Sequence, residues 1–464
     1  MRSIVFTLAV FICATASASL QQRQPDAARP PNVVIVMSDD LGYGDLSSYG
    51  ALDARTPHID SLGRDGARMT DFYANGVLCS PTRAALITGR YQQRYGIETA
   101  LGGEGTRGLV ATNQSLPRLL KDNGYATALI GKWHLGGVAD SRPGAHGFEY
   151  FFGFLGSHID HYEHNRGRNQ PDLWENDTAV QHNGYMTDLI TSRALTFIEQ
   201  NASRPFFIDV AYNAPHWPYQ PPDKPSVAPG NARHLQPQDD PTSTRGEYVE
   251  MVERVDRGVG DILRTLDRLR LSTNTIVIFT NDNGGEWLSR NAPFFHRKWT
   301  VWEGGIRVPA LVRWPGRIPA GVVSRQVGMT MDLTKSILGA TGSRIPVDLE
   351  GIDLFAILEG RTPQTERTVF WRAGMGNRPQ RAARSGDWKL IVDGTHVMVF
   401  DLGSDLGERN DLANQRQDVA RRLRVSLAEW ERAVDADSVS TGRGGGPARG
   451  LRGPGARGGG DMVQ

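Results

Sequence analysis

Two pairs of oxygen-bearing residues directly follow apolar segments that lie far apart in the chain. These pairs are Asp39 and Asp40, after residues 32–37, and Asp282 and Asn283, after residues 275–280. If both segments are parallel strands, their carboxyl ends meet at one sheet edge, where ligands bind in open α/β folds. Three carboxylates and an amide oxygen form a hard site that suits Ca²⁺ or Mg²⁺. A turn or a helix cap is the alternative interpretation of each pair.

A second candidate for chemistry is Cys79, which begins the segment CSPTR. Pro81 suits the first turn of a helix, so Cys79 is expected at a helix N-terminus, where the partial positive charge favours an anion. Arg83 follows one turn later and can direct its guanidinium to the same point. Both features are expected to lower the pKa of a thiol, so a plain thiolate nucleophile is one interpretation. A buried and inert cysteine is the other.

The elements that must position these residues are those of an α/β fold. Short β-branched runs alternate with segments of helical period, which predicts a large mixed, mainly parallel sheet covered by helices on both faces. The expected strands lie at residues 32–37, 125–130, 205–211, 275–280 and 306–312. The clearest helix is expected at residues 247–269, where apolar residues recur with helical spacing. The Pro-rich segment 215–229 is expected to be a long surface loop.

The C-terminal part predicts a smaller unit. Strand-like runs and one amphipathic segment indicate an antiparallel sheet with one helix. The runs lie at residues 368–371, 388–392 and 396–400, and the helix at 419–434. We therefore place a catalytic domain at residues 30–360 and a smaller α+β subdomain at residues 361–440. Residues 441–464, rich in Gly and Arg, are expected to be a disordered tail.

The N-terminus has the pattern of a secretory signal peptide at residues 1–18. A basic Arg2, an apolar run and small residues ending at Ala18 form this pattern. The run is shorter than the roughly 20 residues of a spanning helix, so no stable membrane insertion is expected. Cleavage near Ala18 removes Cys13, which leaves Cys79 without a partner for a disulfide. We expect a secreted or periplasmic protein.

Composition excludes nucleic acid as a partner. The 464 residues carry a formal net charge of +1, with 39% hydrophobic and 22% charged residues. These values are ordinary for a globular protein, and they imply no basic face for nucleic acid.

The motifs, in their order, resemble those of the type I sulfatases. CSPTR at residues 79–83 resembles the family signature, GYATALIGKWHLG at 124–136 its second signature, and KWTVWEGGIRVP at 298–309 its lysine motif. Together with the two acidic segments, the matching blocks run from residue 32 to about residue 309. The resemblance implies an arylsulfatase-like enzyme of the alkaline phosphatase superfamily, whose cysteine a formylglycine-generating or sulfatase-maturing enzyme oxidises to formylglycine.

The resemblance also implies roles for individual residues. The ligands of Ca²⁺ or Mg²⁺ are expected to be Asp39, Asp40, Asp282 and Asn283. The catalytic residues are expected to be Cys79, Arg83, Lys132, His134, His216 and Lys298. The residues that bind substrate are expected to be Lys132, His216, Lys298, Ser157 and His158. Taken singly, a loop lysine is usually solvated, and a histidine beside a tryptophan, such as His216, is often a packed side chain. His146, His161, His164 and His182 match no motif.

The substrate is expected to be a sulfated carbohydrate or a small sulfate ester. The loops at residues 158–177 and 215–240 contain Arg166, Arg168, Trp174, Trp217 and Tyr219. These side chains suit an acidic sugar, because arginines pair with carboxylates and aromatic faces stack on rings. Ordinary surface packing explains the same residues. Two other functions stay open: a phosphate or phosphonate monoester hydrolase of the same superfamily, and a non-catalytic secreted glycan-binding homologue.

Overall fold

The structure is a computed structural model that describes residues 29–166, 170–224, 242–374 and 379–436. The expected signal peptide, the expected tail and Arg168 lie outside the described residues. Within the described part, no helix is both long enough and apolar enough to span a membrane.

A ten-stranded mixed sheet forms the centre of the molecule. Its strands, from one edge to the other, are β13 (Val322–Ser324), β2 (Ala67–Met69), β12 (Ala310–Arg313), β11 (Thr275–Asn281), β1 (Asn32–Ser38), β10 (Phe206–Ala211), β4 (Ala126–Lys132), β5 (Tyr150–Phe154), β8 (Trp174–Glu175) and β9 (Thr178–Ala179). The five strands from β11 to β5 are parallel to one another, and β12 pairs with β11 in the antiparallel direction. The predicted fold class is confirmed.

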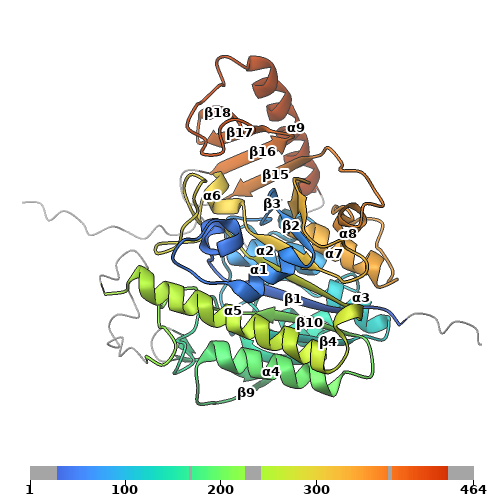
Figure 1. Ribbon diagram of the computed structural model, residues 1–464. Helices are drawn as coiled ribbons and strands as arrows, with labels where there is room; N and C mark the ends of the chain where they lie inside the picture. Colours follow the sequence, from blue (N-terminus) through green and yellow to red (C-terminus); the bar gives the residue numbers. More distant parts are fainter. Residues whose placement is uncertain (1–28, 167–169, 225–241, 375–378, 437–464) are drawn as a thin grey trace, which may run out of the picture.

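Helices cover both faces of this sheet, which is why its central strands read as continuous apolar runs. One face packs against α1 (Pro57–Arg64), α4 (Met186–Gln200) and α5 (Arg245–Arg268). The other face packs against α2 (Cys79–Thr88), α3 (Leu116–Asp122), α7 (Thr330–Ala340) and α8 (Leu354–Leu358). Figure 1 shows α4 and α5 together along the lower side of the sheet. All seven residues of β1 are buried, with Val34 and Val36 facing the first group of helices and Val33 and Ile35 facing the second.

A second, antiparallel sheet lies beside the first, at the top of Figure 1. It contains β15 (Thr368–Ala373), β16 (Gln380–Ser385), β17 (Trp388–Asp393) and β18 (His396–Asp401) in this order. Helix α9 (Gln417–Ala436) packs on it through Leu423, Leu427 and Trp430. Two short pairs complete the described strands: β14 (Gly328–Met329) with β3 (Phe72–Tyr73), and β6 (Asn165–Arg166) with β7 (Gln170–Pro171).

One local prediction is wrong, and a second is wrong in part. The strand expected at residues 306–312 is shorter, because α6 (Glu303–Ile306) occupies its start and β12 begins only at Ala310, after Pro309. A proline has no N–H for the strand ladder, which accounts for the late start. The segment expected to be a surface loop is instead packed over its described first part: His216, Trp217 and Gln220 are all buried.

Candidate active site

Neighbouring strands β1 and β11 deliver both acidic pairs to one edge of the large sheet. Ser38 at the end of β1 is in register with Asn281 at the end of β11, so the residues after them continue side by side. The main-chain N–H of Asp40 lies 3.5 Å from Asp282 Oδ1, and Asn283 Nδ2 donates to Asp40 Oδ1 at 2.7 Å. Asp40 has a positive φ of 61°, a conformation that residues at functional sites adopt more often than others.

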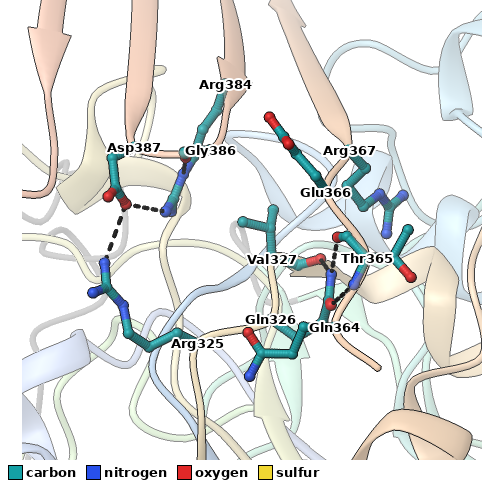
Figure 2. A pocket seen from close by; sticks show the side chains of 10 residues that line it. All are labelled: Arg325, Gln326, Val327, Gln364, Thr365, Glu366, Arg367, Arg384, Gly386 and Asp387. Atoms are coloured by element: carbon teal, nitrogen blue, oxygen red, sulfur yellow. Dashed lines mark hydrogen bonds and ion pairs between the residues drawn. The ribbon is translucent and has the colours of Figure 1, made fainter. Parts of the chain in front are cut away.

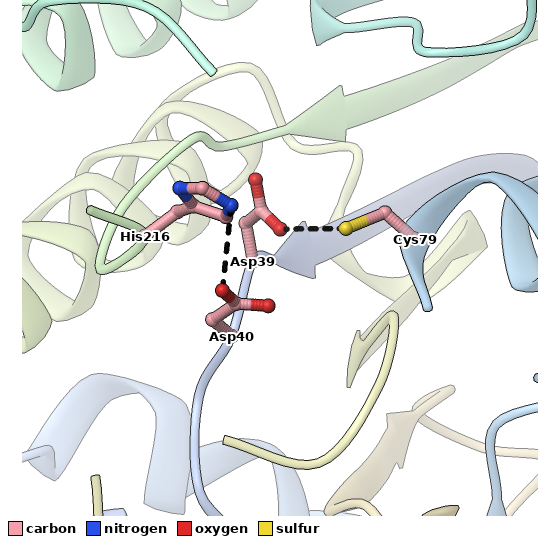
Figure 3. A group of neighbouring side chains, drawn as sticks. All are labelled: Asp39, Asp40, Cys79 and His216. Atoms are coloured by element: carbon pink, nitrogen blue, oxygen red, sulfur yellow. Dashed lines mark hydrogen bonds and ion pairs between the residues drawn. The ribbon is translucent and has the colours of Figure 1, made fainter. Parts of the chain in front are cut away.

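Cys79 is the first residue of α2 and faces this edge. Its Sγ lies 3.6 Å from Asp39 Oδ1. Figure 3 shows the Cys79 and His216 side chains approaching the tip of β1 from opposite sides. Ligand atoms of Asp39, Asp40, Cys79 and His216 all lie within 4.8 Å of one another. The structure therefore brings the proposed nucleophile position and two of the proposed metal ligands into one compact group.

The expectation of a lowered thiol pKa is wrong. Burial raises the pKa of the Cys79 thiol, and the carboxylate of Asp282 raises it further. The arginine that was expected to offset this effect is engaged elsewhere. Arg83 Nε and Nη2 donate to Asp282 Oδ2 at 3.1 and 2.8 Å, and Nη1 donates to the Lys132 carbonyl at 3.1 Å. An unmodified thiol at this position is therefore protonated at neutral pH and is a poor nucleophile.

Two buried lysines neutralise the carboxylates of β1. Lys132 Nζ lies 2.6 Å from Asp39 Oδ2, and Lys298 Nζ lies 2.7 Å from Asp40. Burial alone would lower the pKa of both lysines, but their carboxylate partners raise it. Both ammonium groups are therefore charged, and they stand beside the thiol position.

The two histidines predicted for catalysis each have one ring nitrogen fixed by a main-chain carbonyl. His134 Nε2 lies 2.8 Å from the Leu101 carbonyl, so this nitrogen carries the proton, and the buried Nδ1 has no partner. His216 Nδ1 donates to the Trp217 carbonyl, which leaves Nε2 to face Lys298 Nζ at 3.5 Å and Asp40 at 3.4 Å. Burial holds the pKa of both histidines well below the ordinary value, and the lysines lower it further, so both rings are neutral.

The charge and donor set of the edge fit a hard divalent cation. Three buried carboxylates, those of Asp39, Asp40 and Asp282, face three cationic side chains, and Asn283 Oδ1 is buried without a hydrogen-bond partner. An unpaired amide oxygen beside carboxylates is the donor chemistry that Ca²⁺ and Mg²⁺ require. Burial alone would raise the pKa of the Asp282 carboxyl, but Arg83 and Lys132 hold that pKa below its ordinary value. This ligand therefore stays ionised.

A cavity of about 200 Å³ opens onto this group. Cys79, His134, His216 and Lys298 line it, together with both residues that were predicted outside the matched motifs, Ser157 and His158. Ser157 Oγ lies 2.8 Å from His158 Nδ1, and the His158 ring stacks on that of His216 with centroids 5.9 Å apart. The remaining lining residues are Leu78, Ala100, Trp217, Glu286 and Trp299.

Glu286 and Trp299 were missed by the sequence analysis. Both stand next to residues that had been assigned: Glu286 follows the second acidic pair by three positions, and Trp299 follows Lys298. The place of Glu286 just after the second acidic pair, and of Trp299 within the motif at residues 298–309, is the signal that could have identified them.

Several residues suggested for sugar binding do not reach the cavity. Trp174 and Tyr219 are buried elsewhere, and Arg166 pairs with Glu104 at 4.0 Å. Of the members of that group that the structure describes, Trp217 alone lines the cavity. His146, His161 and His164 are buried and contact main-chain carbonyls of other residues. These side chains are accounted for by packing.

A larger cavity of about 400 Å³ lies away from this site, beside the second sheet (Figure 2). Its arginines already have carboxylate partners: Arg325 lies 3.1 Å from Asp387, and Arg384 lies 2.6 Å from Asp71. Arg367 lies 2.6 Å from Asp332. Because these arginines are already paired with carboxylates, this cavity attracts an anion less strongly than the site at the sheet edge does.

Comparison with known proteins identifies the family. The model of the family described as Sulfatase matches residues 31–343, and that described as N-sulphoglucosamine sulphohydrolase, C-terminal, matches residues 291–433. The chain is 37% identical to N-acetylgalactosamine-6-sulfatase of Canis lupus familiaris, over 75% of this chain and 69% of that protein. The protein of the same name from Rattus norvegicus is 36% identical, over 88% of this chain and 87% of that protein.

Solved structures agree with the sequence comparisons. The crystal structure of Ps i-CgsB superposes with a TM-score of 0.81 at 27% identity, covering 89% of this chain and 94% of that one. The same protein in complex with k-i-k-neocarrahexaose gives a TM-score of 0.80 at 28% identity. The chain therefore belongs to the sulfatase family. It is a sulfatase, an enzyme that hydrolyses sulfate esters.

Proposed function

We propose that this enzyme removes sulfate from carbohydrates, with a formylglycine derived from Cys79 as its nucleophile and a bound Ca²⁺ held by Asp39, Asp40, Asp282 and Asn283. The observation that supports the proposal most strongly is the meeting of one cysteine, three carboxylates and two charged lysines at one sheet edge, beside a cavity that Cys79 and Lys298 line. An anionic sulfate monoester is attacked readily only where cations neutralise its oxygens.

The modified residue and the metal supply what the unmodified side chains lack. A formylglycine hydrate at position 79 would supply one hydroxyl to attack sulfur as the alcohol departs, and a second hydroxyl whose deprotonation would break the carbon–oxygen bond to sulfate and restore the aldehyde. Asp39, Asp40, Asp282 and Asn283 would hold a divalent cation, whose charge would neutralise these carboxylates and leave Lys132 and Lys298 to bind the sulfate oxygens. The raised pKa of the Cys79 thiol is a further reason to prefer the modified residue over a thiolate.

His134 is the residue we assign to accept the proton that elimination releases. Its Nδ1 is unpartnered, its Nε2 is fixed by the Leu101 carbonyl, and the ring is neutral. A neutral imidazole with one free lone pair beside the nucleophile has the form of a general base.

Lys298 is the residue we assign to protonate the departing alcohol. Its ammonium group holds a proton, whereas the neighbouring His216 is neutral and accepts from it through Nε2. His216 then orients Lys298. Lys132 and Lys298 together would bind the sulfate oxygens, and Arg83 holds Asp282 in place.

The names of relatives support a carbohydrate substrate. The mammalian relatives are called N-acetylgalactosamine-6-sulfatases, and one solved relative binds a neocarrahexaose. We propose the same chemical class of substrate here, and a secreted or periplasmic location after cleavage near Ala18. A formylglycine-generating or sulfatase-maturing enzyme is the partner that this proposal requires.

Paired substrates test the reaction. Full-length protein, expressed with a maturing enzyme, is assayed on an aryl sulfate, the corresponding aryl phosphate and a panel of sulfated oligosaccharides. We expect the sulfates to be hydrolysed and the phosphate to be cleaved much more slowly. Dominant phosphatase activity would favour the phosphate ester hydrolase, and carbohydrate binding without turnover would favour a glycan-binding protein.

A further inference from the structure

Resting on the function proposed above, we infer that the cavity wall formed by Glu286 and Trp299 selects sulfated sugars without a carboxylate, and that the sugar ring packs against the Trp299 indole. Both residues line the same cavity as Cys79 and Lys298. Neither of them belongs to the catalytic set described above.

Trp299 is held in place at the cavity mouth despite a strained backbone. Its φ is 81°, which a bulky residue rarely adopts and which is typical of ligand-contacting positions. Its indole Nε1 donates to Glu286 Oε1 at 2.9 Å, and its main-chain N–H donates to the Val77 carbonyl at 3.1 Å. Trp299 as a whole residue nevertheless stays 39% exposed. The surrounding contacts thus fix an aromatic surface in a position where solvent, or a ligand, reaches it.

Exposed aromatic surface is uncommon on this molecule. Among the large hydrophobic side chains exposed in the described residues, only Trp287 and Trp299 are aromatic, and only Trp299 lines the cavity. Both rings have a cation nearby, since the Arg297 guanidinium carbon lies 5.4 Å from the Trp287 ring centroid and Lys298 Nζ lies 5.7 Å from that of Trp299. The C–H face of a pyranose ring is the part of a sugar that packs on such an indole, since an aromatic ring offers a large apolar surface.

The charges of the wall disfavour an acidic sugar. Glu286 is 9% exposed and its Oε2 lies 3.8 Å from Lys298 Nζ. Lys298 is the one lysine or arginine among the described residues that line the cavity, and the proposed function assigns it to the sulfate group. A sugar carboxylate would find no further cation there and would be repelled by Glu286, while a hydroxyl could donate to it. This differs from the acidic sugar that the loop arginines suggested.

Matched substrates test the selection in the unaltered enzyme. The protein, with Cys79 converted to formylglycine and metal bound, is assayed on three pairs of substrates. Each pair is a nitrophenyl galactoside and a nitrophenyl galacturonide that carry sulfate at the same oxygen, O2, O3 or O4. The galactoside 6-sulfate is assayed as well, although it has no galacturonide counterpart, because C6 of a hexuronate is the carboxylate. We expect kcat/KM to be at least tenfold higher for the galactoside of each hydrolysed pair. Hydrolysis of the 6-sulfate alone would also support the proposal, whereas equal values within a pair would overturn it.

Three variants then test the wall. Trp299→Ala is expected to raise KM for the galactoside sulfate at least fivefold with a smaller change in kcat. Glu286→Gln keeps an acceptor for the Trp299 indole but removes the negative charge. This variant is expected to lower the ratio of kcat/KM for the galactoside to kcat/KM for the galacturonide about tenfold. Trp287→Ala is the matched control, because this exposed tryptophan does not line the cavity. The KM of this variant for the galactoside sulfate is expected to equal that of the wild type.

The outcomes separate this inference from the function on which it rests. If none of the sulfates, including an aryl sulfate, is hydrolysed, the proposed function fails. If sulfates are hydrolysed, the inference alone is tested by two variants that melt at the wild-type temperature. An unchanged KM in Trp299→Ala, or an unchanged preference for galactosides over galacturonides in Glu286→Gln, would show that the role given to Glu286 and Trp299 is wrong.

Discussion

At the scale of single residues, Arg83 makes several buried contacts that a substitution would break. It is 4% exposed and donates to both Asp282 and the Lys132 carbonyl, so it links the second acidic pair to the strand that carries Lys132. A lysine is a point charge and cannot reproduce this fork. We expect Arg83→Lys to lower kcat/KM for an aryl sulfate on the order of a hundredfold, as loss of a fixed active-site donor does.

Arg64→Lys is the control for that measurement. Arg64 also pairs with an aspartate, Asp65 at 3.0 Å, but both side chains are exposed. Exposed pairs contribute little, so this variant should keep wild-type kcat/KM. Equal losses in both variants would contradict the role given to Arg83.

Asp40→Asn tests the cation site. The substitution keeps the shape of the side chain and removes one of the three carboxylates that meet at the sheet edge. Because Ca²⁺ affinity depends on the number of charged ligands, we expect a weaker Kd by titration calorimetry and loss of activity that added Ca²⁺ only partly restores. Asp65→Asn, at an exposed aspartate, should leave the Kd unchanged. Wild-type activity that survives prolonged chelation would contradict a catalytic metal.

The sequence could predict which residues meet at the sheet edge but not all of their protonation states. Each of the assigned catalytic and metal-binding residues lies at the sheet edge, because apolar strands followed by acidic residues fix where the carboxylates go. The pKa of Cys79 could not be predicted, since it depends on burial and on Asp282, which comes from a distant strand. Glu286 and Trp299 meet through folding rather than through spacing.

At the scale of secondary structure, strand β10 contains a buried acid with no evident catalytic task. Asp209 is 4% exposed, its Oδ1 has no hydrogen-bond partner, and burial raises its pKa from 3.8 to about 7. The folded protein therefore holds this proton over a pH range in which the unfolded chain releases it. Folding stability contributed by this group is present below pH 4 and is lost as pH rises toward 7, by up to about 4 kcal/mol.

Asp209→Asn is expected to remove this dependence. Urea unfolding of both proteins at pH 5, 6, 7 and 8 should give a free-energy difference, variant minus wild type, that increases with pH and levels off above pH 7. All other titrating groups are shared, so they cancel in the difference. Parallel stability curves would show that Asp209 does not titrate in this range.

The buried strands and long helices were predictable, and the short ones were not. Central strands such as β1 and β11 are apolar throughout because helices cover both faces, and α5 shows its period over 24 residues. By contrast β16, with the sequence QRAARS, has no apolar alternation and is a strand only because β15 and β17 pair with it on both sides. Tertiary pairing here overrides local preference.

At the scale of the whole molecule, buried ion pairs join the two sheets next to the active site. Lys389 of β17 is fully buried, with Nζ 2.7 Å from Glu303 and 2.8 Å from Glu408. Glu303 begins α6, only five residues after Lys298, and it also pairs with Arg307 at 3.0 Å. The C-terminal sheet thus supports the segment that carries Lys298 and Trp299. The domain boundary near residue 360 stays a prediction.

Lys389→Met should therefore affect both stability and catalysis. It leaves two buried carboxylates without their shared cation, and breaking a buried pair in this way costs about 3–5 kcal/mol. We expect a lower Tm and a raised KM. Lys335→Met on α7, a half-buried lysine for which the structure shows no ion pair, is the control. A lower Tm with wild-type KM would limit the junction to a structural role.

The central claim is that oxidised Cys79 is the nucleophile at a site built for a sulfate ester. The most direct test is to prepare the protein with graded conversion of residue 79, quantify formylglycine by mass spectrometry of the peptide that contains it, and measure aryl sulfate hydrolysis on the same samples. We predict that the rate rises in proportion to the converted fraction and is absent in Cys79→Ala. Full activity in unconverted protein, or fully converted and metal-loaded protein without activity, would contradict the account.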